Sequence, residues 1–275
     1  MNDSPAAAER SYDDFYARFD SPLANAIRHE VYGRDIGQHS WVLAEELEGD
    51  SQLLRLSRSS RLLDLGCGPG GPLCFVMGLT GCRAIGLDLS PEAIASATAR
   101  ARILGLQERI TLRVADLDET LDIEARSFDS AISLDVVLHL RNRSQAFGEI
   151  ARVLVPGGRF VFTDAGVITG DVSNEEIRLR SLHGRTHFVS PGFNERMLAS
   201  AGLRLLDQVD RTGSLLEVSS RRQAVRLAHR AELESQEGVE GFDRQQRYLE
   251  TVCSLSRRKA VARVMYVAEC ESATR

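Results

Sequence analysis

The chain has 275 residues, enough for one large α/β domain with a substantial core. Its hydrophobic content of 43% and charged content of 27% are ordinary for a soluble globular protein. The net charge of -5 argues against a nucleic-acid partner, which would need a basic face to meet phosphates. No apolar run is long enough to cross a bilayer, and no signal peptide is visible in the first residues.

The five cysteines show no Cys-x-x-Cys pairing of the metal-binding type. Reduced thiols are the simplest interpretation, and they predict a cytoplasmic protein that carries no metal. The sequence leaves the oligomeric state open.

Residues 1–58 are expected to form a helical lid ahead of the core. Aromatic residues recur there at i, i+3, i+4 and i+7, which places them on one face of a helix. This stripe consists of Tyr12, Phe15, Tyr16 and Phe19. Leucines between positions 43 and 54 indicate a further helix before the core begins.

Residues 59–275 are expected to form the core, in which short apolar strands alternate with amphipathic helices. This alternation predicts a parallel sheet covered by helices on both faces. The expected strands are 61–65, 84–87, 110–114, 130–134, 159–163, 203–209 and 261–268. Helices are expected after Ser90-Pro91, at 147–154, at 191–201 and twice within 214–257. The segments near 165–190, which holds few regular signals, and 214–257 are interpreted as insertions.

A glycine-rich run follows the first expected strand: Asp64-Leu65-Gly66-Cys67-Gly68-Pro69-Gly70-Gly71. Glycines let the backbone turn sharply and approach a ligand closely, and the following helix offers free N–H groups. The pattern Gly-x-Gly-x-x-Gly alone is weak evidence, because it also suits a dinucleotide loop or a plain strand-to-helix turn.

Three carboxylates add to this loop. Asp64 would repel a pyrophosphate but suits a positively charged amino-acid moiety. Asp88 ends the second strand, where an acidic residue can accept both hydroxyls of a ribose. Asp116 follows the third strand, near where an adenine amine would lie.

Together these features resemble the class I S-adenosylmethionine-dependent methyltransferase family, of the small-molecule type. The resemblance is strong over residues 60–165 and rests on five segments in order: Asp64-x-Gly66-x-Gly68-x-Gly70, Gly86-Leu87-Asp88-Leu89-Ser90, Asp116, Phe128–Ser133 and Leu154–Phe160. It implies a Rossmann-like sheet of seven strands with an antiparallel last strand, and S-adenosyl-L-methionine as the cofactor. The cofactor-binding residues that it implies are Asp64, Gly66, Gly68, Gly70, Asp88, Leu89, Ala115, Asp116, Leu134, Ser40, Trp41 and Tyr16.

A segment before the core, Gly33 to Trp41, loosely resembles sarcosine-type, tocopherol-type and cyclopropane-synthase methyltransferases. Their pattern is roughly Asp-Ile-His-x-Gly-x-aromatic, and here Gly37 replaces the histidine and His39 replaces the glycine. The resemblance places Ser40 and Trp41 over the methionine end of the cofactor. Simple packing of Trp41 on the core is the alternative.

Methyl transfer is an in-line displacement at a sulfonium, so positioning supplies much of the rate and no metal is needed. Asp135 and His139 follow the fourth strand, where the family places groups that face cofactor and acceptor. Asp135 can attract a cationic amine, and His139 can accept a proton near neutral pH or serve a structural role. His183 and His187 have a metal-type spacing, but Gly184 and the missing acidic ligand favour a lid or loop.

The sequence therefore predicts a transferase of small-molecule metabolism that methylates a nitrogen or oxygen nucleophile. A nicotinamide-dependent oxidoreductase and a non-catalytic S-adenosylmethionine-binding protein are the alternatives. The sequence does not identify the acceptor, because one fold hosts many reactions.

Overall fold

The computed structural model describes residue 13 and residues 15–181 and 186–271. In this part of the chain, seven strands form a single sheet in the order β3-β2-β1-β4-β5-β7-β6. Neighbours run parallel from β3 to β5, and β7 is antiparallel to both β5 and β6. The strands are β1 (Arg61–Leu65), β2 (Arg83–Asp88), β3 (Ile110–Val114), β4 (Phe128–Leu134), β5 (Leu154–Ile168), β6 (Leu203–Asp210) and β7 (Val261–Cys270). This arrangement confirms the predicted Rossmann-like α/β sheet.

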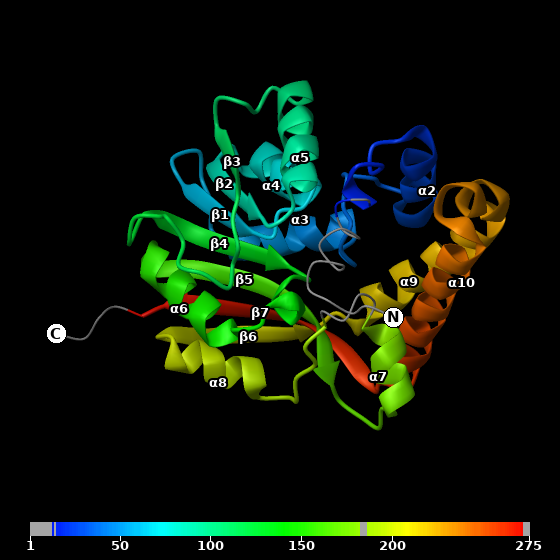
Figure 1. Ribbon diagram of the computed structural model, residues 1–275. Coiled ribbons are helices and arrows are strands. Elements are labelled where there is room, and N and C mark those ends of the chain that lie inside the picture. Colours follow the sequence, from blue (N-terminus) through cyan, green and yellow to red (C-terminus); the bar gives the residue numbers. More distant parts are fainter. Residues whose placement is uncertain (1–12, 14, 182–185, 272–275) are drawn as a thin grey trace.

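Helices cover both faces of the sheet (Figure 1). One layer contains α3 (Ala44–Leu53), α4 (Gly71–Thr80) and α5 (Pro91–Ile103), and the other contains α6 (Arg143–Val153) and α8 (Phe193–Ser200). Successive strand residues point to opposite faces, which builds two separate cores. Leu62 and Val161 belong to the first core, whereas their neighbours Leu63 and Phe160 belong to the second.

Four more helices gather beyond one end of the sheet, and we call them the helical cap (Figure 1). They are α2 (Pro22–Tyr32), α7 (Asn174–Arg180), α9 (Thr212–Ala228) and α10 (Arg230–Arg257). The cap has an apolar cluster of its own, in which Val31, Leu215 and Leu249 are fully buried around Trp41. Among the described helices, none is both long and apolar enough to span a membrane.

Most predicted elements are confirmed to within a few residues, including the Ser90 cap of α5. The segment 165–190 holds more regular structure than its few sequence signals predicted, because β5 extends to Ile168 and α7 follows. A capping box between Ser173 and Glu176 starts α7 and satisfies its first free N–H groups. Within the segment expected to form a lid, α3 packs against α4 in one layer of the core.

Candidate functional site

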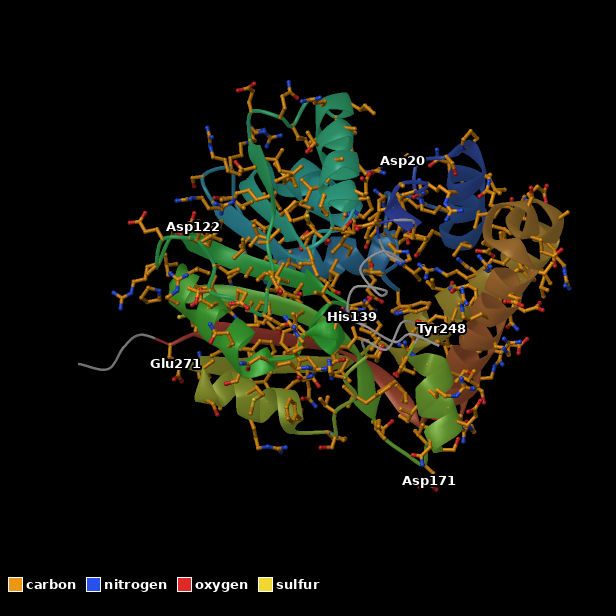
Figure 2. The ribbon with its side chains drawn as sticks, viewed as in Figure 1. Asp20, Asp122, His139, Asp171, Tyr248 and Glu271 are labelled. Atoms are coloured by element: carbon orange, nitrogen blue, oxygen red, sulfur yellow. The ribbon has the colours of Figure 1, made fainter. Side chains whose placement is uncertain are left out.

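A cavity of about 1230 Å³ lies where β1, β2 and β4 end. The glycine-rich run, the N-terminal segment from Asp13 and the helical cap all contribute to its lining. Figure 2 shows His139, beside the sheet, and Tyr248, on α10, and both residues line this cavity. The carboxyl ends of parallel strands are the usual binding edge of such sheets.

The glycine-rich run is tied back onto β2. The backbone N–H groups of Gly66 and Cys67 both donate to the carbonyl oxygen of Leu87, at 2.8 and 2.9 Å. Gly66 has a φ of 79°, and a Cβ there would lie 2.4 Å from Val136, so only glycine fits. Gly66 and Gly68 line the cavity and leave the backbone open to a ligand.

Gly70 must be a glycine for a different reason, which is packing. A Cβ at this position would lie 2.8 Å from the Cβ of Ala97, so the missing side chain lets the run pack closely on α5. Neither Gly70 nor Ala115 is among the residues that line the cavity. The backbone N–H of Ala115 instead donates to the carbonyl oxygen of Asp88, at 2.9 Å.

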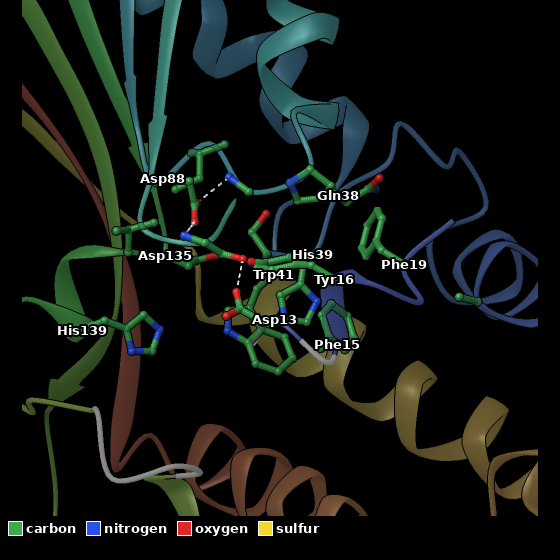
Figure 3. Close-up of a pocket in the computed structure, with 18 of the residues that line it drawn as sticks. Asp13, Phe15, Tyr16, Phe19, Gln38, His39, Trp41, Asp88, Asp135 and His139 are labelled. Atoms are coloured by element: carbon green, nitrogen blue, oxygen red, sulfur yellow. Dashed lines mark hydrogen bonds between the residues drawn. The ribbon is translucent and has the colours of Figure 1, made fainter. Parts of the chain in front are cut away.

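Asp88 is held at the cavity by the backbone of the glycine-rich run and by the turn that follows β2. Its two carboxylate oxygens accept from the backbone N–H groups of Gly68, at 2.8 Å, and Ser90, at 3.0 Å (Figure 3). Burial raises the pKa of Asp88, and those two N–H groups partly oppose this rise. Each oxygen keeps lone-pair capacity for a further donor, which suits a pair of hydroxyls.

Asp64 is the most deeply buried acid of the cavity lining, at 3% exposure. Burial, with a smaller contribution from the charge of Asp88, raises the pKa of Asp64 to about 8. A cation that binds beside such a buried carboxyl group stabilises its ionised form. Asp116 lines the cavity further along, where it also pairs with Arg141 at 3.3 Å.

The N-terminal aromatic residues close one side of the cavity. In the view of Figure 3, Phe15, Tyr16 and Phe19 lie on one side and His139 on the other. The rings of Phe15 and His39 lie 4.2 Å apart between centroids, and Tyr16 and Phe19 also contact that histidine. Three members of the predicted stripe therefore come together at the cavity. Tyr12 lies outside the described residues.

Arg100 connects this lid to the glycine-rich run and was not found from the sequence. Its Nε donates to the carbonyl oxygen of Pro69 at 3.0 Å, and its Nη2 pairs with Asp20 at 2.8 Å. The guanidinium also lies directly against Gly37, where a Cβ would come within 2.5 Å of it. No motif marks Arg100, which occupies a helix of ordinary composition.

Asp135 is committed to partners inside the protein. Its carboxylate accepts from the backbone N–H of Trp41 at 2.9 Å, the Thr163 hydroxyl at 2.8 Å and Arg263 Nε at 2.8 Å. Arg263 is completely buried and also pairs with Glu46 at 2.5 Å. This network balances the charge of Asp135, and it fixes the backbone that presents Trp41.

Trp41 and the histidines occupy the half of the cavity below the cap. The Trp41 ring stacks on Tyr248 of α10, with 6.4 Å between centroids. Burial, the nearby Arg222 and Arg28, and His139 hold the pKa of His39 well below its usual range, so its ring is neutral at pH 7. Leu89, Leu134, Ser40, His139 and His187 also line the cavity, whereas His183 lies outside the described residues.

Comparisons with known proteins agree with this geometry. Residues 63–162 match the family described as a methyltransferase domain. Methyltransferase GfsG of Streptomyces halstedii is 34% identical over 111 residues, which are 40% of each chain. The 24-methylenesterol C-methyltransferase 2 of Oryza sativa subsp. japonica is 28% identical over 58% of this chain and 41% of its own. The chain thus spans about two-fifths of the length of these curated relatives.

Similarity in structure extends over nearly the whole chain. A cyclopropane synthase of Mycobacterium tuberculosis superimposes with a TM-score of 0.79 at 14% identity, covering 94% of this chain and 98% of that one. At this identity the comparison supports the fold alone. Residues 63–162 carry a methyltransferase domain.

Proposed function

We propose that the protein transfers a methyl group from S-adenosyl-L-methionine to a nitrogen or oxygen atom of a small molecule. The observation that carries this proposal is the joint cavity, which has a glycine-lined half with Asp88 and a second half below the helical cap. The first half fits the cofactor, and the second leaves room for an acceptor. When bound, the cofactor supplies a methyl carbon on a positively charged sulfur.

The residues fit the cofactor in separate ways. Asp88 holds the ribose hydroxyls through its two oriented oxygens, and Asp64 offers its charge to the amino-acid end. Asp116 lies where the adenine amine is expected, and the open backbone at Gly66 and Gly68 permits close approach. The contacts of Leu89, Leu134, Ser40, Trp41 and Tyr16 with the cofactor stay predictions.

The protein's part in the chemical step is to position the acceptor in line with the methyl carbon. His139 is the proposed base for an acceptor that must lose a proton, because it lines the cavity directly after β4. The low pKa of His39 keeps that ring neutral, so it adds no positive charge beside the proposed base. The acceptor role predicted for Asp135 stays a prediction, and its contacts favour a positioning role.

The experiment that tests this function measures cofactor binding first and turnover second. S-adenosylhomocysteine at 100 times its Kd is expected to stabilise the fold by about 2.7 kcal/mol, whereas NAD is expected to have no effect. Acceptors are then screened by release of S-adenosylhomocysteine from S-adenosylmethionine. Stabilisation by NAD alone would support an oxidoreductase. Binding without release in any acceptor mixture would support a non-catalytic binding protein.

We also propose a cytoplasmic location. All five cysteines are free and buried, a state that a reducing compartment maintains. Secretion of the native protein into an oxidising compartment would contradict this proposal.

A further inference from the structure

The half of the cavity below the cap is rich in arginine. The charged lining residues from α7, α9 and α10 are Arg180, Arg222, Arg226, Arg244 and Glu237. Glu237 already pairs with Arg226, so it neutralises one of these cations and leaves the others. The opposite half, around the glycine-rich run, carries Asp64, Asp88 and Asp116. Acids therefore predominate in the half around the glycine-rich run, where Arg141 pairs with Asp116, and arginines predominate in the half below the cap.

Arg180, the last residue of α7, is a buried cation at 3% exposure. Its Nη1 donates to the Tyr248 hydroxyl at 3.0 Å and its Nη2 to the carbonyl oxygen of Ala165 at 3.1 Å. Within the described ranges, no carboxylate forms an ion pair with it. Burying a charge is costly unless an opposite charge is supplied, so this position favours an anion from outside the chain.

Arg222, on α9, is a second cation of the cavity lining, and it is half-buried. It donates to the Tyr32 hydroxyl and to the carbonyl oxygens of His39, at 2.5 Å, and Ser40, at 3.2 Å. These acceptors are uncharged, and none of the described carboxylates forms an ion pair with Arg222. Its guanidinium lies over the Trp41 ring, 4.6 Å from the centroid.

The two arginines flank a stacked aromatic pair. The guanidinium of Arg180 lies 5.3 Å from the centroid of Tyr248, and Tyr248 stacks on Trp41 at an interplanar angle of 30°. We call this set of four residues the arginine–aromatic wall. Its rings offer an apolar surface, and its guanidinium groups offer forked donors that match the geometry of carboxylate and phosphate.

We propose that the arginine–aromatic wall binds an oxyanion of the methyl acceptor, so that the acceptor is a small molecule bearing a carboxylate or phosphate. This inference rests on the proposed methyltransferase function and assigns its substrate class. The wall disfavours a cationic amine, because two arginines face the acceptor while Asp135 is already paired with Arg263. The apolar part of the acceptor lies against Trp41 and Tyr248.

Trp41 provides the readout, because it is the single tryptophan of the chain and part of the wall. The full-length protein, saturated with S-adenosylhomocysteine, is titrated with benzoate, phenyl phosphate and neutral benzamide, and Trp41 fluorescence and calorimetry follow binding. At least one anion is expected to bind about tenfold or more tightly than benzamide. The tighter of the two anions identifies the group that the wall prefers.

Variants of the wall test the assignment directly. Arg180→Gln and Arg222→Gln are each expected to remove the preference for the anion, and Arg222→Lys should restore part of it. Matched controls are Arg178→Gln in α7 and Arg221→Gln in α9, which alter exposed arginines outside the cavity lining. These controls should keep the preference. If Arg180→Gln does not fold, the Arg222 variants decide the question.

Two results would overturn the inference: equal affinity for benzamide and both anions, or an anion preference that survives in the folded Arg180→Gln and Arg222→Gln variants. Calorimetry with S-adenosylhomocysteine separates the two proposals. Lack of cofactor binding would overturn the proposed function, whereas cofactor binding without an anion preference would overturn only the assignment of the acceptor.

Discussion

At the scale of single residues, the raised pKa of Asp64 is expected to make cofactor binding depend on pH. Burial and the charge of Asp88 raise this pKa to about 8, so the side chain is mostly protonated at pH 6. A cationic ligand favours the ionised form, so binding below that pKa must release a proton. The affinity for S-adenosylmethionine is expected to fall about tenfold for each pH unit below the pKa.

Calorimetry between pH 6 and pH 8, in buffers with different ionisation enthalpies, measures both the affinity and the released proton. Asp64→Asn is the control and should show a flatter profile. The same raised pKa means that the cofactor-free protein loses stability as pH rises from about 4 to about 8, where the loss levels off. An affinity that is flat with pH in the wild-type protein would remove the charge role of Asp64.

Asp135 gives a second prediction at this scale. Asp135→Asn keeps the shape of the side chain, and asparagine tolerates the φ of 58° found there. It removes the negative charge beside the fully buried Arg263, so the free energy of unfolding should fall by about 3 to 5 kcal/mol. Chemical denaturation measures this loss. If stability stayed unchanged while the KM of the acceptor rose, Asp135 would instead be the acceptor carboxylate predicted from sequence.

These residues differ in how far their positions and contacts could be predicted from the sequence. The position of Asp64 and Asp88 at the cavity could be predicted, because their distances from the glycine-rich run follow from the strand–turn–helix order. The partner of Asp135 could not, because Arg263 lies 128 residues further along the chain. Arg180 belongs to no motif, and its buried state depends on how α7 meets α10.

At the scale of elements, α5 joins the lid to the cofactor half of the cavity through Arg100. Arg100→Ala removes its contacts with Pro69 and Asp20, of which the second is a charge pair. The affinity for S-adenosylhomocysteine is expected to fall by about 1 to 2 kcal/mol while the fold is retained. Calorimetry measures this change. Arg102→Ala, in the exposed last turn of the same helix, is the matched control and should bind normally.

Hydrogen exchange adds a second readout for the same variant. With S-adenosylhomocysteine bound, the amides of residues 15–20 should be less protected from exchange in Arg100→Ala than in Arg102→Ala. Equal protection in the two variants would mean that the lid is held by its aromatic contacts alone.

The elements themselves were predictable where hydrophobic periodicity and turn residues agreed. The strand from Ile110 to Val114 was predicted with its observed bounds. The helix α7 was missed although Ser173 and Glu176 form a recognisable capping box, because the helix has only 7 residues. The length of β5 was missed because the register shifts between Asp164 and Val167, which interrupts the alternation.

At the scale of the whole molecule, the cavity lies between two parts with separate hydrophobic cores, the sheet with its helical layers and the helical cap. The sheet and its helical layers have two large cores, whereas the cap is held by a smaller cluster around Trp41 and Leu249. A smaller apolar cluster supports a lower free energy of local opening. Charge follows the same division in the main, since most acids of the lining lie on the sheet side and most arginines lie on the cap.

The cap is therefore expected to open without unfolding of the sheet. In native-state hydrogen exchange, the slowest amides of α9 and α10 should exchange at a free energy about 1 kcal/mol or more below those of β4 and β5. S-adenosylhomocysteine should protect the glycine-rich run most, because we propose that this ligand binds on the sheet side. Adding the preferred anion should then slow exchange in α9 and α10 as well, because Arg222 and Tyr248 hold it from those helices. If α10 and β5 instead exchanged at one common free energy, the cap and the sheet would form a single cooperative unit, and the acceptor would enter without opening of the cap.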